Sequence, residues 1–380
     1  MPALANKTYF NYGGQGPLPT PSLEAINEAF ATIQELGPFT SAVWPWLETL
    51  TSRLRRTLSA ACGVHPHRLA LTENVSSGCV LPLWGLPWEP GDQILISDCE
   101  HHGVVAACAE LARRQGLQLG SFGVKALVGA EGASAPAAAL EALERSLTPN
   151  TRLVVLSHLL WNTGVEMPMA AVAERLAAHP RRPWLLVDAA QSFGSLAIGP
   201  AANAADIYAF TGHKWACGPE GLGGVALSER VLEQAQPTLI GWRNLRQETD
   251  EHSGWHRDGR RFEVATSCVP LFAGLLRSLE LLEQVGPVAQ RLELITERSG
   301  RLWRGLNDLP GVEPVLAIPP TAGLVSFRLR GDDPAAVVKT LGERGLWIRS
   351  LDQPACLRAC THVTTTEAEV DQLLEALASL

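Results

Sequence analysis

Lys214 lies between an apolar run, IYAFT (207–211), and a glycine-rich segment, CGPEGLGG (217–224). A lysine at such a position is usually a solvated surface charge. If the side chain is buried, its ammonium form is disfavoured, and the neutral amine can attack an aldehyde to form a Schiff base. Lys214 is therefore a candidate for covalent binding of a carbonyl cofactor, and the other polar groups of the chain must decide between the two interpretations.

Asp188 ends a second apolar run, WLLVD (184–188), and Gln191 follows shortly after it. A carboxylate at the end of a buried strand needs a cation or hydrogen-bond donors beside it. The protonated ring nitrogen of pyridoxal 5'-phosphate (PLP) is such a cation, and PLP enzymes combine a lysine Schiff base with an acidic residue at that nitrogen. Gln191 is placed to donate to the ring oxygen. The alternative interpretation of Asp188 is a helix cap.

A candidate phosphate site precedes an apolar, helix-like segment, VLPLWGL (80–86). Asn74, Ser76 and Ser77 stand just before this segment. Backbone amides and hydroxyls at the start of a helix bind anions, so these residues are suited to the phosphate of PLP. An ordinary N-cap has the same sequence signature, and the segment alone does not separate the two interpretations.

Two adjacent histidines, His101 and His102, follow the apolar run QILIS (93–97). An imidazole at a strand end can stack on a flat cofactor ring, and it can equally lie in a surface turn. A metal site is disfavoured at this pair and at His65 and His67, because no third ligand stands at a suitable spacing. The sequence therefore predicts no metal.

Arg349 and Arg358 flank a short segment, SLDQPACL (350–357), near the C-terminus. A guanidinium group binds a carboxylate through two parallel hydrogen bonds, which lysine cannot reproduce. An amino-acid substrate requires such an anchor, whereas two surface arginines are the alternative. All these groups occur along one chain, from the phosphate segment to the late arginines, and together they favour a PLP enzyme that acts on an amino acid.

Short apolar runs alternate with helix-like segments through the central part of the chain. The helix-like segments include residues 103–116 and 168–180, and the apolar runs lie at 93–97, 152–158 and 183–192. This alternation predicts βαβ units and an α/β fold with a mostly parallel sheet covered on both faces. Catalytic groups collect at the carboxyl ends of such strands, where we expect Asp188 and Lys214.

The pattern changes after about residue 255. A long helical stretch (270–286) leads to an alternating, strand-like segment (323–330), which is followed by further helix and strand patterns. We predict a large cofactor-binding domain over residues 15–255. A smaller α/β domain is expected over residues 256–380, together with the N-terminal segment 1–14.

Composition and charge narrow the class of partner. The chain has 380 residues with 31 basic and 39 acidic side chains, a net charge of −8, and its basic residues form no runs, which argues against nucleic acid and acidic membranes. No apolar stretch approaches the roughly 20 residues of a membrane span, and no secretion signal is recognised. The eight cysteines are scattered, which is typical of a reducing compartment. These features predict a cytoplasmic protein with a small-molecule substrate.

Two motifs, VDAAQSFG (187–194) and AFTGHKWACGPEGLGG (209–224), carry a resemblance to a known family. They resemble the class V aminotransferases of the fold-type I PLP enzymes, a group that includes cysteine desulfurases and isopenicillin N epimerase. The resemblance extends from about Tyr9 to the C-terminus and is strongest to the L-cysteine/L-cystine C-S lyases of that group. It implies a large domain with a mixed, mostly parallel seven-stranded sheet and a smaller α/β C-terminal domain. It also implies a homodimer.

The resemblance assigns the cofactor contacts residue by residue. Lys214 would bind PLP covalently, Asp188 would pair with the ring nitrogen, and Gln191 would contact the ring oxygen. His101 would stack on the ring, and it is preferred over His102 because it follows Glu100 as in the family's Glu-His pattern. Further contacts are implied for the phosphate, with one of these residues reaching it from the second subunit: Ser76, Ser77, Thr211, His213 and, from that subunit, Thr266.

The resemblance also implies a substrate site and a reaction. Arg349 and Arg358 match residues that bind the substrate carboxylate, and Trp242 matches an aromatic residue near the substrate. The expected reaction is a β-elimination that converts cysteine or cystine into pyruvate, ammonia and sulfide or cysteine persulfide. The sequence names no sulfur acceptor. An amino-acid epimerase of the isopenicillin N type stays open as an alternative, because its first steps are the same.

A cysteine desulfurase is the weaker alternative. The family's desulfurases place a nucleophilic cysteine on a mobile loop before the last arginine. Here the segment between Ile348 and Arg358 is short and contains only Cys356, with no base beside it. A thiol so placed is poorly suited to leave its position and attack a substrate sulfur.

Overall fold

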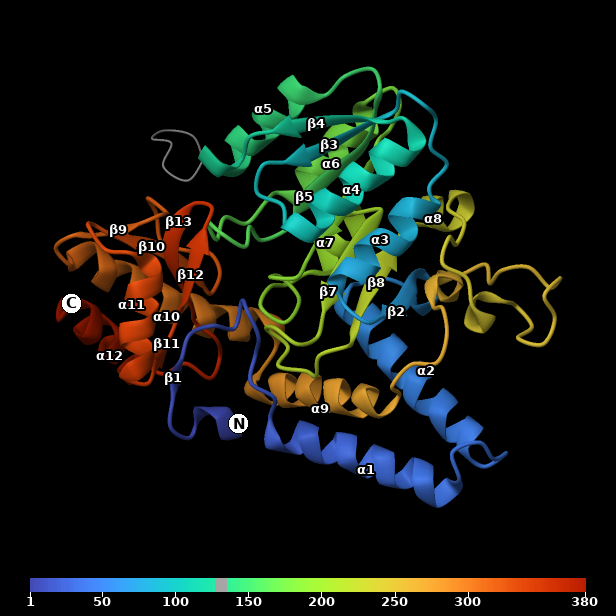
Figure 1. Cartoon of the computed structure of the whole chain (residues 1–380), viewed down its shortest axis with the longest axis horizontal. Coiled ribbons are helices and arrows are strands. Elements are labelled where there is room, and N and C mark those ends of the chain that lie inside the picture. Colours follow the sequence, from blue (N-terminus) through green and yellow to red (C-terminus); the bar gives the residue numbers. More distant parts are fainter. Residues whose placement is uncertain (127–134) are drawn as a thin grey trace.

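The fold is built around a seven-stranded sheet, which lies in the middle of Figure 1. The structure is a computed structural model that describes residues 1–126 and 135–380. In spatial order the strands are β2 (Leu69–Thr72), β8 (Gly223–Leu227), β7 (Ile207–Thr211), β6 (Trp184–Asp188), β5 (Thr151–Ser157), β3 (Gln93–Ser97) and β4 (Gln118–Phe122).

The sheet is mostly parallel. Only β8 runs against its neighbours, pairing antiparallel with both β2 and β7, whereas the pairs from β7 to β4 are parallel. Strands β6, β7 and β8 are buried at every position. A strand covered on both faces reads as a continuous apolar run, which is why these strands were recognisable in the sequence. The predicted fold class is confirmed.

Helices cover both faces of this sheet. One face packs against α3 (Val75–Gly85), α4 (His102–Gln115) and α8 (Glu229–Gln234). The other face packs against α2 (Val43–Ala61), α5 (Ala135–Ser146), α6 (Met169–Ala178), α7 (Gly199–Ala204) and α9 (Pro270–Val285). Helix α1 (Thr20–Leu36) lies along α9 at the outside of this layer (Figure 1). In the described part of the chain, no helix combines the length and apolarity needed to cross a membrane.

A second, four-stranded antiparallel sheet follows in the C-terminal part, in the order β12-β13-β10-β9. Its own apolar core is shared with helices on one side of it. The strands are β9 (Val312–Pro314), β10 (Leu324–Leu329), β12 (Arg349–Asp352) and β13 (Ala355–Cys360), and the helices are α10 (Val288–Asp308), α11 (Pro334–Glu343) and α12 (Glu367–Ala378).

The N-terminal segment joins the two sheets. Strand β1 (Thr8–Tyr9) pairs in parallel with β11 (Leu346–Trp347), and Phe10 accepts a hydrogen bond from the amide of Cys360 at 2.7 Å. A few residues later, the amide of Gly16 donates to the carbonyl of His213 at 2.8 Å. The first residues of the chain thus pass from the small sheet to the carboxyl edge of the large one. The domain boundaries at 14/15 and 255/256 stay a prediction.

Candidate active site

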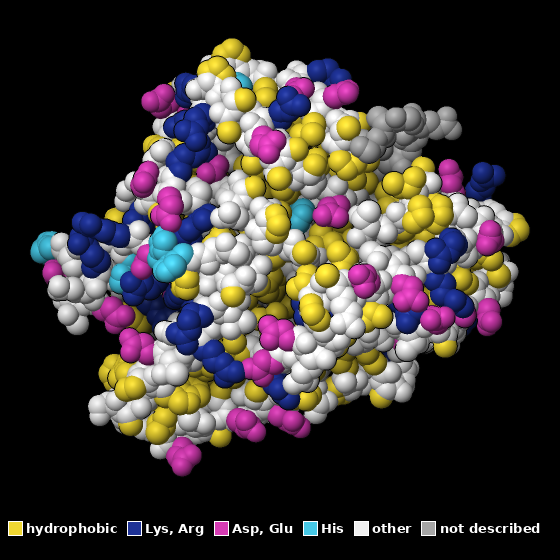
Figure 2. All heavy atoms as spheres, turned by 180° about the vertical axis from the view of Figure 1, so that it is seen from behind, with side chains coloured by type: hydrophobic (Ala, Val, Ile, Leu, Met, Phe, Trp, Pro, Cys, Tyr) yellow, Lys and Arg dark blue, Asp and Glu magenta, His cyan; other side chains and the backbone are white. Residues whose placement is uncertain are grey.

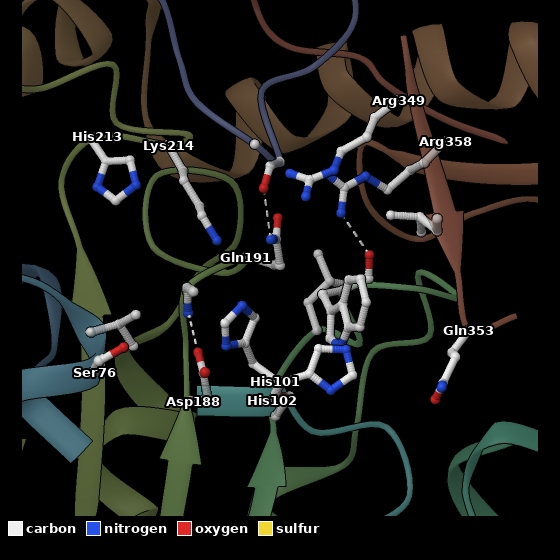
Figure 3. Close-up of a pocket in the computed structure, with 18 of the residues that line it drawn as sticks. Ser76, His101, His102, Asp188, Gln191, His213, Lys214, Arg349, Gln353 and Arg358 are labelled. Carbon is white, nitrogen blue, oxygen red and sulfur yellow. Dashed lines mark hydrogen bonds between the residues drawn. The ribbon is translucent and has the colours of Figure 1, made fainter. Parts of the chain in front are cut away.

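A pocket of about 450 Å³ lies where the carboxyl ends of the large-sheet strands face the β12–β13 hairpin (Figure 3). Most of the residues singled out in the sequence line it, although they come from six different segments of the chain. The predicted residues in its lining are Ser76, His101, Asp188, Gln191, His213, Lys214, Arg349 and Arg358. Asp188 and Lys214 lie in the pocket because catalytic groups collect at the carboxyl ends of parallel strands. The β12–β13 hairpin supplies Arg349 and Arg358.

Lys214 points into the pocket from the loop after β7 (Figure 3). Burial lowers the pKa of its ammonium group to about 8, against the opposing attraction of Asp188. Within the described residues, Lys214 forms no ion pair. The loop that carries it is closely packed, because a Cβ on Gly16 would lie 2.1 Å from the Lys214 carbonyl oxygen. A buried, unpaired and fixed amine is the form of lysine that a Schiff base requires.

Asp188 is the last residue of β6 and is buried beside the pocket. Its Oδ1 accepts a hydrogen bond from the amide of Ala190 at 2.9 Å. Burial raises the pKa of Asp188 and outweighs the opposing effects of the Ala190 amide, Lys214 and His101. A ring-nitrogen cation supplies the missing charge, so the residues present fit PLP.

His101 caps the start of α4, and its Nδ1 accepts a hydrogen bond from the amide of Gly103 at 3.2 Å. Burial lowers the pKa of His101, and an accepting Nδ1 places the proton of the neutral ring on Nε2. In Figure 3, His101 lies beside Asp188, whereas His102 lies toward Gln353. This arrangement supports His101 over His102 as the ring that stacks on the cofactor.

The amino end of α3 borders the pocket near Lys214. Asn74 is the N-cap, and its Oδ1 accepts a hydrogen bond from the amide of Ser77 at 2.9 Å. Asn74 and Ser76 line the pocket, whereas Ser77 and Thr211 do not. Thr211 instead pairs with Nδ1 of His213 at 2.7 Å. The N-cap is confirmed, and a capped helix start that faces a cavity is compatible with a bound anion, so the phosphate site stays a prediction.

Arg358 is an almost fully buried guanidinium at the pocket wall. It stands opposite Arg349 in the β12–β13 register and donates to the carbonyl of Trp161 at 2.8 Å. Its Nε has no hydrogen-bond partner among the described residues, and none of their carboxylates pairs with it. Burial lowers its pKa. A buried guanidinium without an anion is suited to a substrate carboxylate.

Gln191 is held by two partners on the pocket wall. Its Nε2 donates to the carbonyl of Gly13 at 2.9 Å, and its Oε1 accepts from Nε1 of Trp215 at 2.9 Å. The approach of Gly13 is close, because a Cβ there would lie 2.9 Å from Oε1 of Gln191 and 3.0 Å from Nη2 of Arg358. The second N–H of the Gln191 Nε2 group is left to donate to a ligand in the pocket.

Besides Ser77 and Thr211, two further predicted site residues, Trp242 and Thr266, do not line the pocket of their own chain. Trp242 lines a separate pocket with Trp44, Arg55 and Asp258, and Thr266 is exposed. A place for either residue at the cofactor therefore requires a second copy of the chain. The contribution of Thr266 from a second subunit stays a prediction.

Several lining residues were not identified from the sequence. Ser157 is the last residue of β5 and Trp161 follows shortly after it, so the strand-end rule that marked Asp188 could have marked them too. Gly13 and Gly14 lie in a cluster of glycines, NYGGQG (11–16), whose spacing hinted at a close backbone approach. Nothing in the sequence showed that this segment reaches the pocket.

None of the eight cysteines, all of which lie in the described residues, lines the pocket. Cys356 stands opposite Leu351 within the β12–β13 hairpin and is buried in a small apolar cluster. Burial raises the pKa of its thiol, which leaves it un-ionised and unreactive.

The chain is similar to known proteins over its whole length. Residues 72–373 match the family model "Aminotransferase class-V". Isopenicillin N epimerase from Streptomyces clavuligerus is 31% identical, covering 97% of this chain and 94% of that protein. Cysteine desulfurase from Haloferax volcanii is 28% identical, covering 80% of this chain and 71% of that protein.

A solved structure is more similar still. The cystine C-S lyase C-DES, in complex with its reaction product cysteine persulfide, is 43% identical and superposes with a TM-score of 0.94. The match covers 100% of this chain and 99% of that one. In a second structure of C-DES, a lysine-to-alanine mutant, glycine is covalently linked to the PLP cofactor.

These findings define the class of protein. The chain belongs to the class V aminotransferase family, and its fold is that of the fold-type I PLP enzymes. The cofactor of this family is PLP, which agrees with the buried lysine and the buried, unpaired carboxylate at the pocket.

Proposed function

We propose that this protein is a PLP-dependent carbon–sulfur lyase that cleaves the Cβ–S bond of cystine or cysteine. With cystine and water, the products are pyruvate, ammonia and cysteine persulfide; with cysteine, sulfide replaces the persulfide. The main support is the β12–β13 hairpin, which places two arginines on the pocket, whereas its two cysteines, Cys356 and Cys360, are buried and do not line the pocket. The 43% identity to a cystine C-S lyase over the whole chain points the same way.

When bound, PLP withdraws electrons from the substrate Cα and so makes its proton acidic. The chain's own residues then have separate roles. Arg358 and Arg349 bind the substrate carboxylate and orient the Cα–H bond. Asp188 pairs with the ring nitrogen and keeps it protonated, which in turn keeps the carboxylate ionised despite its burial.

Lys214 is the base of the reaction. Its pKa of about 8 means that a substantial share of the amine is neutral near physiological pH. With the substrate bound, the neutral Nζ would take the Cα proton, and the Cβ–S bond would break with its electron pair leaving on sulfur. A persulfide is a better leaving group than the hydrosulfide that cysteine would release, which favours cystine over cysteine.

The test is pyruvate formation by the purified holoenzyme supplied with L-cystine, measured with lactate dehydrogenase and NADH. We expect steady pyruvate release from the wild type and a fall of roughly a thousandfold in the Lys214→Ala variant, as for loss of a general base. Borohydride should fix PLP to the wild-type chain and not to the variant. A variant that retains the fixed cofactor would refute the assignment of Lys214.

Amino-acid epimerisation is the second candidate, because a relative that is an isopenicillin N epimerase matches 97% of this chain. The two reactions share proton removal and differ in whether Cα is reprotonated or the Cβ–S bond breaks. Chiral chromatography of the amino acid left after incubation separates them, since an epimerase gives the D-configured product without pyruvate.

A desulfurase activity would need a thiol in the pocket, and none of the eight cysteines is placed there. A Cys356→Ala variant should therefore produce sulfur species at the wild-type rate. Loss of activity in this variant would favour the desulfurase reading.

We also propose that the protein is a cytoplasmic homodimer. All eight cysteines are free, as suits a reducing compartment. Apolar side chains gather at the lower left of the face in Figure 2. Exposed hydrophobic residues include Phe30 in α1, Phe39 in the segment between α1 and α2, and Trp44 at the start of α2. A second copy seated there would cover this surface and bring Trp242 and Thr266 towards the partner's pocket.

A further inference from the structure

Glu100 is a buried carboxylate that the mechanism above does not use. It lies in the turn between β3 and α4 and is 5% exposed. Its Oε1 accepts hydrogen bonds from Oγ of Ser97 at 2.6 Å and from the amide of Ser157 at 2.8 Å. Its Oε2 accepts from Oγ of Ser157 at 2.7 Å. Three donors from two neighbouring strand ends therefore meet on one side chain.

These contacts connect the segments that carry the site. Ser157 lines the pocket and stands directly opposite Asp188 in the parallel register of β5 and β6. The next amide, of His158, donates to the Asp188 carbonyl at 3.0 Å. On the other side, Glu100 is joined to His101 by one peptide bond. A single carboxylate thus ties the backbone of His101 to the strand end beside Asp188.

We propose that Glu100 is a positioning residue, which sets His101 and the end of β5 at the correct distance from Asp188 so that the cofactor ring fits between them. The inference rests on the proposed roles of His101 and Asp188. Glu100 itself touches neither substrate nor cofactor, because it is not part of the pocket lining. Its effect on PLP is transmitted through Ser157 and the His101 backbone.

The buried surroundings of Glu100 favour a positioning role through hydrogen bonds over a role that depends on its negative charge. Burial raises the pKa of Glu100 to about 7, and the hydrogen bonds from Ser97 and Ser157 oppose it only in part. The other titratable groups that interact electrostatically with Glu100 are Asp188, Cys79, Cys99 and Cys108. No cation compensates the carboxylate within this set, so its hydrogen bonds, rather than its charge, explain its presence.

Two variants separate hydrogen bonding from charge. Glu100→Gln keeps an oxygen for Ser97 and the Ser157 amide, and its NH₂ group can donate to Oγ of Ser157. Glu100→Ala removes all three contacts. The readouts are the dissociation constant of PLP, from tryptophan fluorescence of the apoprotein, and the visible circular dichroism of the bound cofactor, which reports how firmly the ring is held.

We expect Glu100→Ala to weaken PLP binding about tenfold or more and to reduce the dichroism, as for the loss of hydrogen bonds to a buried carboxylate. Glu100→Gln should remain within about threefold of the wild type. Equal impairment of both variants would overturn the proposal, because charge would then be the cause. Unchanged binding and dichroism in Glu100→Ala would overturn it as well.

Asp92 offers a matched control. It is another buried carboxylate, 3% exposed, at the opposite end of β3, where it accepts from the amide of Glu89 and pairs with Arg181. Asp92→Asn should lower thermal stability without changing PLP affinity or dichroism. If Glu100→Ala does not fold, Ser157→Ala removes one of the same contacts and should weaken PLP binding in the same direction, and no change there would overturn the proposal.

The two proposals fail in different ways. If wild-type protein supplied with cystine forms no pyruvate, the proposed reaction fails and the PLP-binding comparison of the Glu100 variants still applies. If pyruvate forms and the Glu100→Ala cofactor is held as firmly as in the wild type, only the positioning role fails.

Discussion

Lys214 and Asp188 face the same pocket, yet burial pulls both towards their neutral forms. Neither side chain has an ion-pair partner among the described residues, and Arg358 on the opposite wall lacks an anion as well. A pocket whose buried lysine, carboxylate and guanidinium have no charged partner is electrostatically incomplete without its ligands. The pyridinium and phosphate of the cofactor and the carboxylate of an amino acid complete it.

At the residue scale, Arg358→Lys should raise KM for cystine by about tenfold to a hundredfold, because a charge-assisted, two-pronged contact becomes a single one. The absorbance spectrum of the bound PLP should not change. Steady-state kinetics with pyruvate detection give the result, and Arg344→Lys, an exposed arginine bonded to Ser379, is the control. An unaltered KM would remove Arg358 from the carboxylate site.

The pH dependence of cofactor capture follows from Lys214. Only the neutral amine attacks the aldehyde, so the rate should rise with pH and level off above about 8, the pKa that burial gives this lysine. Stopped-flow absorbance after mixing apoprotein with PLP measures it. A midpoint near the ordinary lysine pKa, about 10.4, would show that the amine is not desolvated.

At the element scale, the start of α3 has two tasks. Its cap, Asn74, satisfies one free amide of the helix, and the remaining amino end faces the cavity. Gly78 lets this helix approach the sheet, since a Cβ there would lie 3.0 Å from the Cβ of Ala209 and 3.3 Å from the carbonyl oxygen of Gly224. Helix α3 therefore packs closely on strands β7 and β8 beside the predicted phosphate site.

Replacing Asn74 with alanine should lower the free energy of unfolding by about 1 kcal/mol, the usual effect of losing an N-cap. The same change should weaken PLP binding, because the helix start frays at the cavity. Denaturant unfolding and PLP titration provide the two measurements. Asn307→Ala, at an exposed position within α10, is the control and should affect stability much less and PLP binding not at all. Equal PLP affinity in the Asn74→Ala and Asn307→Ala variants would show that the N-cap does not contribute to PLP binding.

At the scale of the whole molecule, the pocket exists only where two sheets and the N-terminal segment meet. The large sheet contributes Asp188 and the Lys214 loop, and the hairpin of the small sheet contributes the arginines (Figure 3). The N-terminal segment closes the join through Gly13. Movement of one sheet relative to the other would therefore change the substrate end of the pocket while leaving the cofactor end in place.

The predicted homodimer belongs to this scale. Light scattering after size-exclusion chromatography should give about twice the chain mass of 40.8 kDa. Substituting Phe30 and Phe39 together by glutamate should weaken the dimer at least about tenfold, since charges would be buried at an apolar contact. Ile318→Glu alters an equally exposed apolar residue on the small sheet side and should leave the dimer intact. A monomeric wild type would contradict the prediction.

Much of the large sheet was predictable, because each buried strand leaves a continuous apolar run that is local in the sequence. The lysine, the aspartate and the capped helix start were recognisable for the same reason, since each follows such a run or precedes an apolar helix. Ser157 and Trp161 were missed although they obey the same rule. The part played by Gly13 was not accessible, because its partners Gln191 and Arg358 lie far away along the chain.

By itself, the sequence determined the fold class and several of the types of group that line the pocket, because periodicity and strand-end position are local properties. Only the tertiary structure decided which groups share the pocket and in what ionisation state. The Trp161 carbonyl that accepts a hydrogen bond from Arg358 is 197 positions away in the sequence. The burial that shifts the pKa values of Lys214 and Asp188 comes from segments across the whole chain. Desolvation and ion pairing depend on distances in space, which local sequence patterns do not encode.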